Sequence, residues 1–115
     1  MPSGGFGAGY GNGGDYYSNG AADFATGRVA APNSWISWAR VVPDKNGKLY
    51  GHVAFVEAVG ADGTILISEC GSNIWNNGAG ILVRTIRNTG TATAPNYSYG
   101  SSYKFLGFIY LDQPK

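Results

Sequence analysis

Residues 51–69 read GHVAFVEAVGADGTILISE and consist of two apolar runs joined by a short turn sequence. The runs, residues 51–59 and 64–69, are rich in β-branched and other apolar side chains, a composition that favours strands. Between them, residues 60–63 combine glycine with aspartate, which is typical of a tight turn. The stretch therefore predicts a β-hairpin, and it contains His52, the only histidine of the chain.

The register of this hairpin decides which side chains share a face. If Val59 pairs with Thr64, even-numbered residues of the first run lie on the same face as odd-numbered residues of the second. His52 and Glu69 then share a face at the open end, offset diagonally by one pair, a distance that these side chains can span. Cys70 points to the opposite face, although a β-bulge or an odd loop would exchange the faces. The other residues on the shared face are Ala54, Val56, Ala58, Ile65 and Ile67.

An imidazole beside a carboxylate on an apolar surface is a common arrangement for a catalytic base. The carboxylate of Glu69 would hold one tautomer of the His52 ring and stabilise the imidazolium. The spacing alone supports equally well a histidine at a strand end that is hydrogen-bonded to a glutamate and has no chemical role.

Composition limits the function classes. A chain of 115 residues is long enough for one hydrophobic core, so we predict one domain. The net charge of +1 gives no basic surface for nucleic acid. One cysteine and one histidine exclude an internal disulfide and make a zinc site unlikely, so we expect neither a metal nor another cofactor. No membrane span and no signal peptide are visible, and we expect no membrane partner.

The rest of the chain predicts an α+β fold. Residues 1–17 are too rich in glycine for a regular element and are expected to be a flexible lead-in to a domain over residues 18–115. After Ser18-Asn19 as N-cap, a short helix is predicted to contain Phe24 and to end at Gly27. With the hairpin, three further runs complete an antiparallel sheet of about five strands: residues 34–42, 81–87 and 103–111.

The order of these elements resembles the CHAP family. The resemblance runs from about Ser18 to Leu111 and is most specific in GHVAFVEAV, GADG and TILISE. CHAP domains are cysteine, histidine-dependent amidohydrolases/peptidases of the papain-like superfamily, found in phage endolysins, tail-associated lysins and bacterial autolysins. The resemblance implies a papain-like fold, peptidoglycan as the partner, hydrolysis of its amide bonds, and an extracellular, cell-wall or phage-associated location.

The resemblance also assigns roles to individual residues. His52 matches the catalytic histidine of the family, and Glu69 matches the acidic residue that orients it. Asn73 falls near the asparagine that family members often place shortly after that glutamate.

Aromatic residues around these strands have two possible roles. Tyr50 and Trp75 flank the site strands and could stack on glycan or peptide or pack half-exposed; the two roles fit Trp75 equally well, and packing is favoured for Tyr50. Tyr97 and Tyr99 lie in a loop over residues 88–102, whose length suggests function or mobility, and for both of them packing is the favoured role.

The family's nucleophilic cysteine lies well upstream of the histidine, and residues 1–51 contain none. Three interpretations stay open. The chain is a CHAP domain whose nucleophile helix belongs to a further domain or another chain, or it is a catalytically inactive module that binds the cell wall or serves a phage structure. Alternatively, Cys70 is a relocated nucleophile, although a small buried side chain on a strand fits it better.

Overall fold

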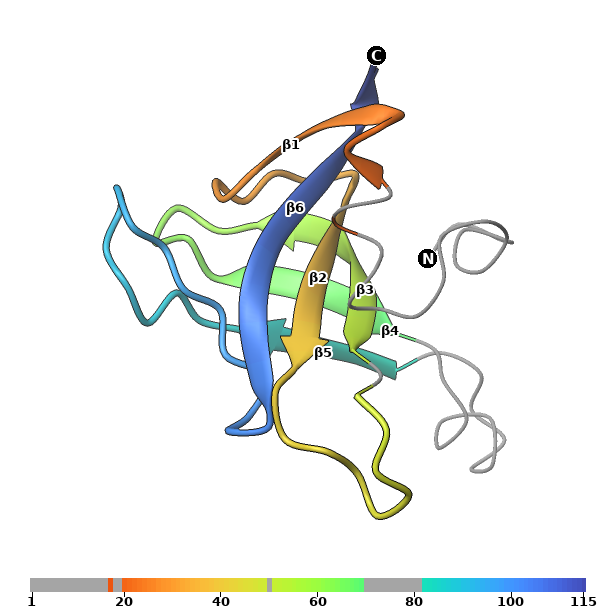
Figure 1. Cartoon of the computed structure of the whole chain (residues 1–115). Helices are drawn as coiled ribbons and strands as arrows, with labels where there is room; N and C mark the ends of the chain where they lie inside the picture. Colours follow the sequence, from red (N-terminus) through yellow and green to blue (C-terminus); the bar gives the residue numbers. More distant parts are fainter. Residues whose placement is uncertain (1–16, 18–19, 50, 70–81) are drawn as a thin grey trace.

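The computed structural model describes residues 17, 20–49, 51–69 and 82–115. They form an antiparallel sheet with the strand order β1-β6-β2-β3-β4-β5. In Figure 1, β6 and β2 run steeply through the molecule and β4 and β5 cross behind them. The strands are β1 (Phe24–Gly27), β2 (Ser34–Arg40), β3 (His52–Val59), β4 (Ile65–Glu69), β5 (Leu82–Ile86) and β6 (Tyr103–Pro114).

The predicted hairpin is formed by β3 and β4, but its turn is one residue longer than expected. Val59 pairs with Ile65 and not with Thr64. The backbone N–H of Gly60 donates to the carbonyl oxygen of Thr64 at 2.7 Å and closes this turn. Gly63 has a φ of 85°, a conformation that glycine adopts without strain. At the turn, the pairing therefore differs from the predicted one by one residue.

A β-bulge at Glu57 compensates for the longer turn. The register shifts between Val56 and Ala58, so that Val56 pairs with Ile67, which is the predicted register. Ala58, which was predicted to lie on the face of His52, is consequently exposed, and Val59 packs against the larger core cluster in its place. Between the bulge and the open end of the hairpin, each side chain therefore lies on the face that the hairpin pattern predicts.

The larger core cluster covers one face of the sheet. Tyr97, in the loop between β5 and β6, is 1% exposed and packs edge-on against Phe105 and Phe108, with ring centroids 5.5 Å away in each case. The loop is therefore held against the sheet by a fully buried aromatic ring. The other buried members are Ile36, Trp38, Ala54, Val56, Ile65 and Ile67.

A second cluster on the opposite face contains Trp35, Val53, Phe55 and Ile109. Trp35, Val53 and Phe55 alternate along β2 and β3 with members of the larger cluster, and Ile109 follows Phe108 on β6. Both faces of the central strands therefore carry buried apolar side chains, and the serines of β2, Ser34 and Ser37, are buried with them.

The predicted N-terminal helix is wrong over most of its length, and the sheet has six strands where about five were expected. Phe24–Gly27 forms β1, which pairs with β6 through Gly27 and Phe108. Gly107 allows this approach, because a Cβ there would lie 2.6 Å from the carbonyl oxygen of Gly27. A run this short is ambiguous in sequence, and pairing with a distant strand decided its conformation.

Helical geometry upstream of β1 is limited to a single turn among the described residues. The N–H of Ala21 donates to the carbonyl oxygen of Tyr17 at 3.1 Å. The α+β class with a short N-terminal helix is therefore not confirmed, and the described part of the chain is mostly antiparallel sheet. Within these ranges, no helix has the length and apolar character that crossing a membrane requires.

Candidate functional site

His52 and Glu69 meet at the open end of the β3–β4 hairpin. His52 begins β3 and Glu69 ends β4, on the face of the larger core cluster. The Nε2 atom of His52 lies 2.6 Å from Oε1 of Glu69. The Glu69 side chain is fully buried, whereas that of His52 is 20% exposed. The structure thus brings together the two residues that the strand pattern placed on one face.

Glu69 accepts hydrogen bonds from three parts of the chain. Besides the contact with His52 on β3, Arg84 on β5 donates from Nε to Oε2 at 2.6 Å and from a terminal nitrogen to Oε1 at 3.2 Å. Tyr99, in the loop between β5 and β6, donates its hydroxyl to Oε1 at 2.6 Å. Both carboxylate oxygens therefore have partners, as a buried charge requires.

These donors keep Glu69 ionised. Burial alone would raise the pKa of Glu69, but the hydrogen bonds from His52, Arg84 and Tyr99 outweigh burial and lower this pKa from 4.5 to about 2. An ionised carboxylate only accepts hydrogen bonds, so the Nε2 atom that faces it carries a proton. In the neutral ring, Nδ1 is then the unprotonated nitrogen, which can accept a proton.

Aromatic rings hold the imidazole in place. Tyr99 stacks on the His52 ring with centroids 4.3 Å apart and an interplanar angle of 22°. Trp38, which pairs with His52 across β2 and β3, lies 5.7 Å from the imidazole centroid at 26°. The indole N–H of Trp38 donates to the carbonyl oxygen of Tyr97 at 2.7 Å. The loop and the sheet are thus connected directly beside the histidine.

The structure assigns different positions to the two loop tyrosines. Tyr97 packs in the core, as favoured from the sequence. Tyr99, for which packing was also favoured, contacts both His52 and Glu69. Arg84 was not predicted as a residue of the site, although it pairs with Ile67 and so lies diagonal to Glu69. Extending the strand pattern to the next strand would have identified it.

Four further residues with predicted roles lie outside the described part of the chain: Tyr50, Cys70, Asn73 and Trp75. Their roles stay predictions from the sequence. Among the residues that are described, no three histidine, cysteine, aspartate or glutamate side chains lie together as metal ligands would.

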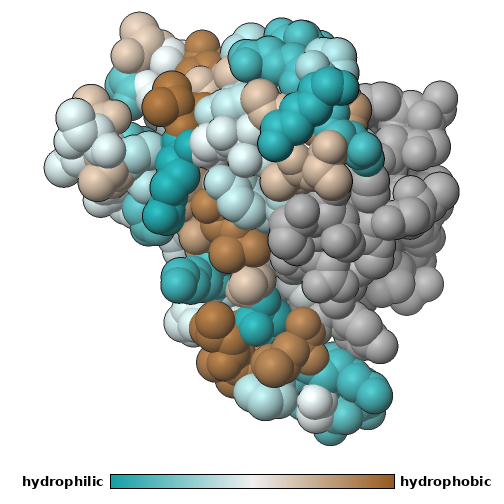
Figure 2. Space-filling view, turned by 45° about the horizontal axis from the view of Figure 1, so that its top comes forward, coloured by the Kyte–Doolittle hydropathy of each residue, from teal (hydrophilic) through white to brown (hydrophobic). Residues whose placement is uncertain are grey.

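An apolar patch lies on the connection between β2 and β3. Val41, Val42 and Leu49 in this connection are 53%, 47% and 54% exposed. Figure 2 shows apolar side chains gathered at the lower end of the molecule, bordered by hydrophilic ones. The predicted strand 34–42 ends at Arg40, so the two valines lie just beyond the end of β2.

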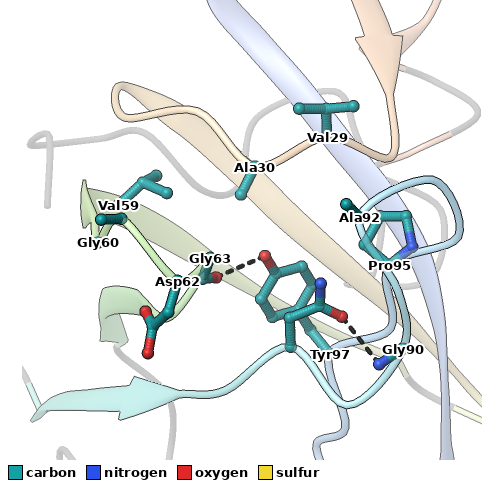
Figure 3. A pocket seen from close by; sticks show the side chains of 12 residues that line it. Val29, Ala30, Val59, Gly60, Asp62, Gly63, Gly90, Ala92, Pro95 and Tyr97 are labelled. Carbon is teal, nitrogen blue, oxygen red and sulfur yellow. Dashed lines mark hydrogen bonds between the residues drawn. The ribbon is translucent and has the colours of Figure 1, made fainter.

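A pocket of about 430 Å³ lies at the other end of β3, far from His52. It is formed by the β3–β4 turn, the loop after β5 and the segment before β2 (Figure 3). Its polar groups bond to one another: the Tyr97 hydroxyl donates to the Gly63 carbonyl oxygen at 2.6 Å, and the Gly90 N–H donates to Asn88 at 2.9 Å. Neither His52 nor Glu69 is among the described residues that line this pocket.

A model of the CHAP domain matches residues 3–71, which include β1 to β4, His52 and Glu69. No curated protein and no solved structure compared with the chain gives a match. CHAP domains have a peptidoglycan hydrolase-type function and act on the cell wall. The match covers more than half of the 115 residues and confirms the resemblance seen in the sequence. The chain therefore belongs to the CHAP domain family.

Proposed function

We propose that this chain is the histidine-bearing part of a peptidoglycan amidase or endopeptidase, from a phage lysin or a bacterial cell-wall enzyme, in which His52 is the general base. The contact of 2.6 Å between Nε2 of His52 and the buried, ionised Glu69 carries this proposal. It leaves Nδ1 as the base, on a ring that is partly exposed to solvent.

The proposed reaction is ordinary thiol-dependent amide hydrolysis. Nδ1 of His52 takes the proton of a cysteine thiol, and the thiolate attacks the carbonyl carbon of a peptidoglycan amide. As the C–N bond breaks, the imidazolium returns its proton to the leaving amine and an acyl-enzyme remains. Water, deprotonated by the same Nδ1, then attacks the acyl carbon and releases a carboxylic acid and the thiol. Glu69 stays ionised and stabilises the imidazolium in both steps.

The source of the thiol separates two forms of the proposal. Cys70 is the only cysteine in these 115 residues, and it directly follows Glu69. Adjacent residues of an extended strand point to opposite faces, so a thiol at this position would be directed away from Nδ1 if the strand continued. We therefore favour a thiol supplied by a further domain or another chain. The second candidate, an inactive wall-binding module, is favoured by the absence of cysteine in residues 1–51.

The test combines hydrolysis with binding. Purified peptidoglycan is incubated with the chain, newly formed amino groups are quantified, and co-sedimentation of the chain is measured in parallel. We expect co-sedimentation, and we expect any release of amino groups to fall by about 10²-fold or more in His52→Ala, because general base catalysis is lost.

Cys70→Ser is the matched variant for the nucleophile. Release that is lost in both variants would make Cys70 the nucleophile and overturn our preference for an external thiol. Binding without release supports the external thiol or the wall-binding module. A chain that neither binds nor cleaves peptidoglycan contradicts the proposed function in both forms.

A further inference from the structure

The groups that hold Glu69 come mostly from beyond the segment that matches the family model. The match ends at residue 71, whereas Arg84 lies on β5 and Tyr99 in the loop before β6. Both contact the carboxylate directly. The geometry of the His52–Glu69 pair thus depends on a region to which the family match assigns nothing.

Tyr99 restrains the imidazole in two ways at once. Its hydroxyl donates to Oε1 of Glu69 at 2.6 Å, the same oxygen that lies 2.6 Å from Nε2 of His52. Its ring stacks on the imidazole with centroids 4.3 Å apart. The hydroxyl therefore fixes the acceptor to which the ring bonds, and the aromatic face restricts the plane in which the ring can lie.

Arg84 restrains the carboxylate itself. Its two nitrogen donors reach both oxygens of Glu69, at 2.6 Å and 3.2 Å. Such a planar, two-point contact fixes the orientation of the carboxylate in addition to compensating its charge. A lysine ammonium group can compensate the charge but cannot make the same planar contact. The guanidinium carbon also lies 4.6 Å from the centroid of the Tyr99 ring, so that Arg84 contacts both members of the arrangement.

The loop that carries Tyr99 is itself anchored two residues earlier. Tyr97 is 1% exposed, its hydroxyl donates to Gly63 at 2.6 Å, and its carbonyl oxygen accepts from the Trp38 indole at 2.7 Å. Trp38 in turn lies 4.8 Å from the Tyr99 ring, measured between centroids. With such an anchor, Tyr99 can be held over His52 at a low entropic cost.

We propose that Arg84 and Tyr99 are positioning residues: Arg84 orients the Glu69 carboxylate, and Tyr99 holds the His52 ring so that Nε2 faces Glu69 and Nδ1 faces outward. The catalytic meaning of this arrangement rests on the proposed function. The arrangement itself can be measured without any turnover.

The single histidine makes the measurement unambiguous. In ¹⁵N-labelled protein above neutral pH, side-chain spectra report which ring nitrogen carries the proton and how fast this proton exchanges with water. We expect a protonated Nε2 and a slowly exchanging proton in the wild type. In Tyr99→Leu and Arg84→Met, we expect exchange to become about 10-fold faster or more, because the shared carboxylate is less well held.

Conservative variants separate positioning from general destabilisation. Tyr99→Phe keeps the stacked ring and Arg84→Lys keeps the charge, so both should give exchange rates between those of the wild type and the drastic variants. Tyr97→Phe is the matched control, because it removes a hydroxyl that also donates at 2.6 Å but to Gly63. The variant keeps the buried aromatic ring and the carbonyl oxygen that accepts from the Trp38 indole, so the loop stays anchored and the imidazole signals should be unchanged. If Tyr99→Leu or Arg84→Met fails to fold, the exchange rate is compared between the wild type and the conservative variant at the same position.

Two results would overturn the inference. One is a wild-type ring that is protonated on Nδ1. The other is an unchanged Nε2 proton in folded Tyr99 and Arg84 variants, which would mean that Glu69 alone positions the ring. A chain that neither binds nor cleaves peptidoglycan would contradict the proposed function and would not affect these spectra, so the two failures are distinguishable.

Discussion

Tyr97 and Tyr99 lie two residues apart in one loop, and each donates its hydroxyl over 2.6 Å, but their acceptors differ. Tyr97 donates to a neutral backbone carbonyl, that of Gly63, at the turn end of the β3–β4 hairpin. Tyr99 donates to the carboxylate of Glu69 at the open end. The acceptor decides the role: a hydroxyl on a backbone carbonyl holds the fold together, and one on a buried carboxylate also affects a proton-transfer group.

The pKa values of the two tyrosines reflect the same difference in acceptor. Burial raises the pKa of Tyr97. For Tyr99, burial and then the hydrogen bond to Glu69 raise the pKa further above its ordinary value. Both tyrosines therefore remain hydrogen-bond donors at neutral pH, and only Tyr99 is coupled to the charge of the site.

The largest expected effect is on the free energy of unfolding and comes from Tyr97, which anchors the loop. Tyr97→Ala should lower the free energy of unfolding by about 3–5 kcal/mol, because it empties a fully buried position between Phe105 and Phe108. Tyr99→Ala should cost less, because that side chain is only half-buried. Urea denaturation followed by tryptophan fluorescence measures both. A greater loss for Tyr99→Ala would reverse the roles that we assign to the two residues.

The second-largest expected effect is the loss of stability at acid pH, which comes from the charge of Glu69 at the open end of the hairpin. The pKa of Glu69 is lowered from 4.5 to about 2 in the folded state, so its contribution to stability is present above about pH 4.5. As the pH falls from there toward 2, the carboxylate becomes protonated and up to about 3 kcal/mol is lost.

Glu69→Gln is the control for this acid response. It removes the titrating group, so the variant should be less stable at neutral pH and lose less stability on acidification than the wild type. Unfolding free energies measured at several pH values between 7 and 2.5 test this. Equal losses in the two proteins would mean that Glu69 is not the group responsible.

The sequence alone was sufficient to predict that His52 and Glu69 lie together, and the structure explains why. The predicted register was wrong at the turn, where Val59 pairs with Ile65. The bulge at Glu57 restores it before the strands reach the site. The apolar pattern of the strand beyond the bulge is strong, and burial of that face enforces the register there.

Long-range contacts were less accessible from the sequence. Phe24–Gly27 became a strand because β6 offers its backbone groups, and nothing local signals this pairing. Tyr99 could not be placed, because the path of a long loop is not encoded in any periodicity. Arg84 could have been found, since it is a charged residue opposite Ile67 on a neighbouring strand. Strand pattern therefore predicts contacts across a sheet better than contacts made by a loop.

The smallest effect compares the two hydroxyls directly. Removal of a hydrogen bond to a neutral carbonyl typically costs about 1 kcal/mol, and of one to a charged group about 1.5–3 kcal/mol. At pH 7, Tyr99→Phe should therefore destabilise the protein more than Tyr97→Phe. The difference should shrink as the pH falls toward 2, the folded-state pKa of Glu69, because a protonated carboxyl group is a neutral acceptor like the Gly63 carbonyl. Urea denaturation of both variants at pH 7 and near pH 2.5 measures this difference. A gap that does not change with pH would show that the Tyr99 hydroxyl does not stabilise the charge of Glu69, and would make the two ends of the hairpin equivalent.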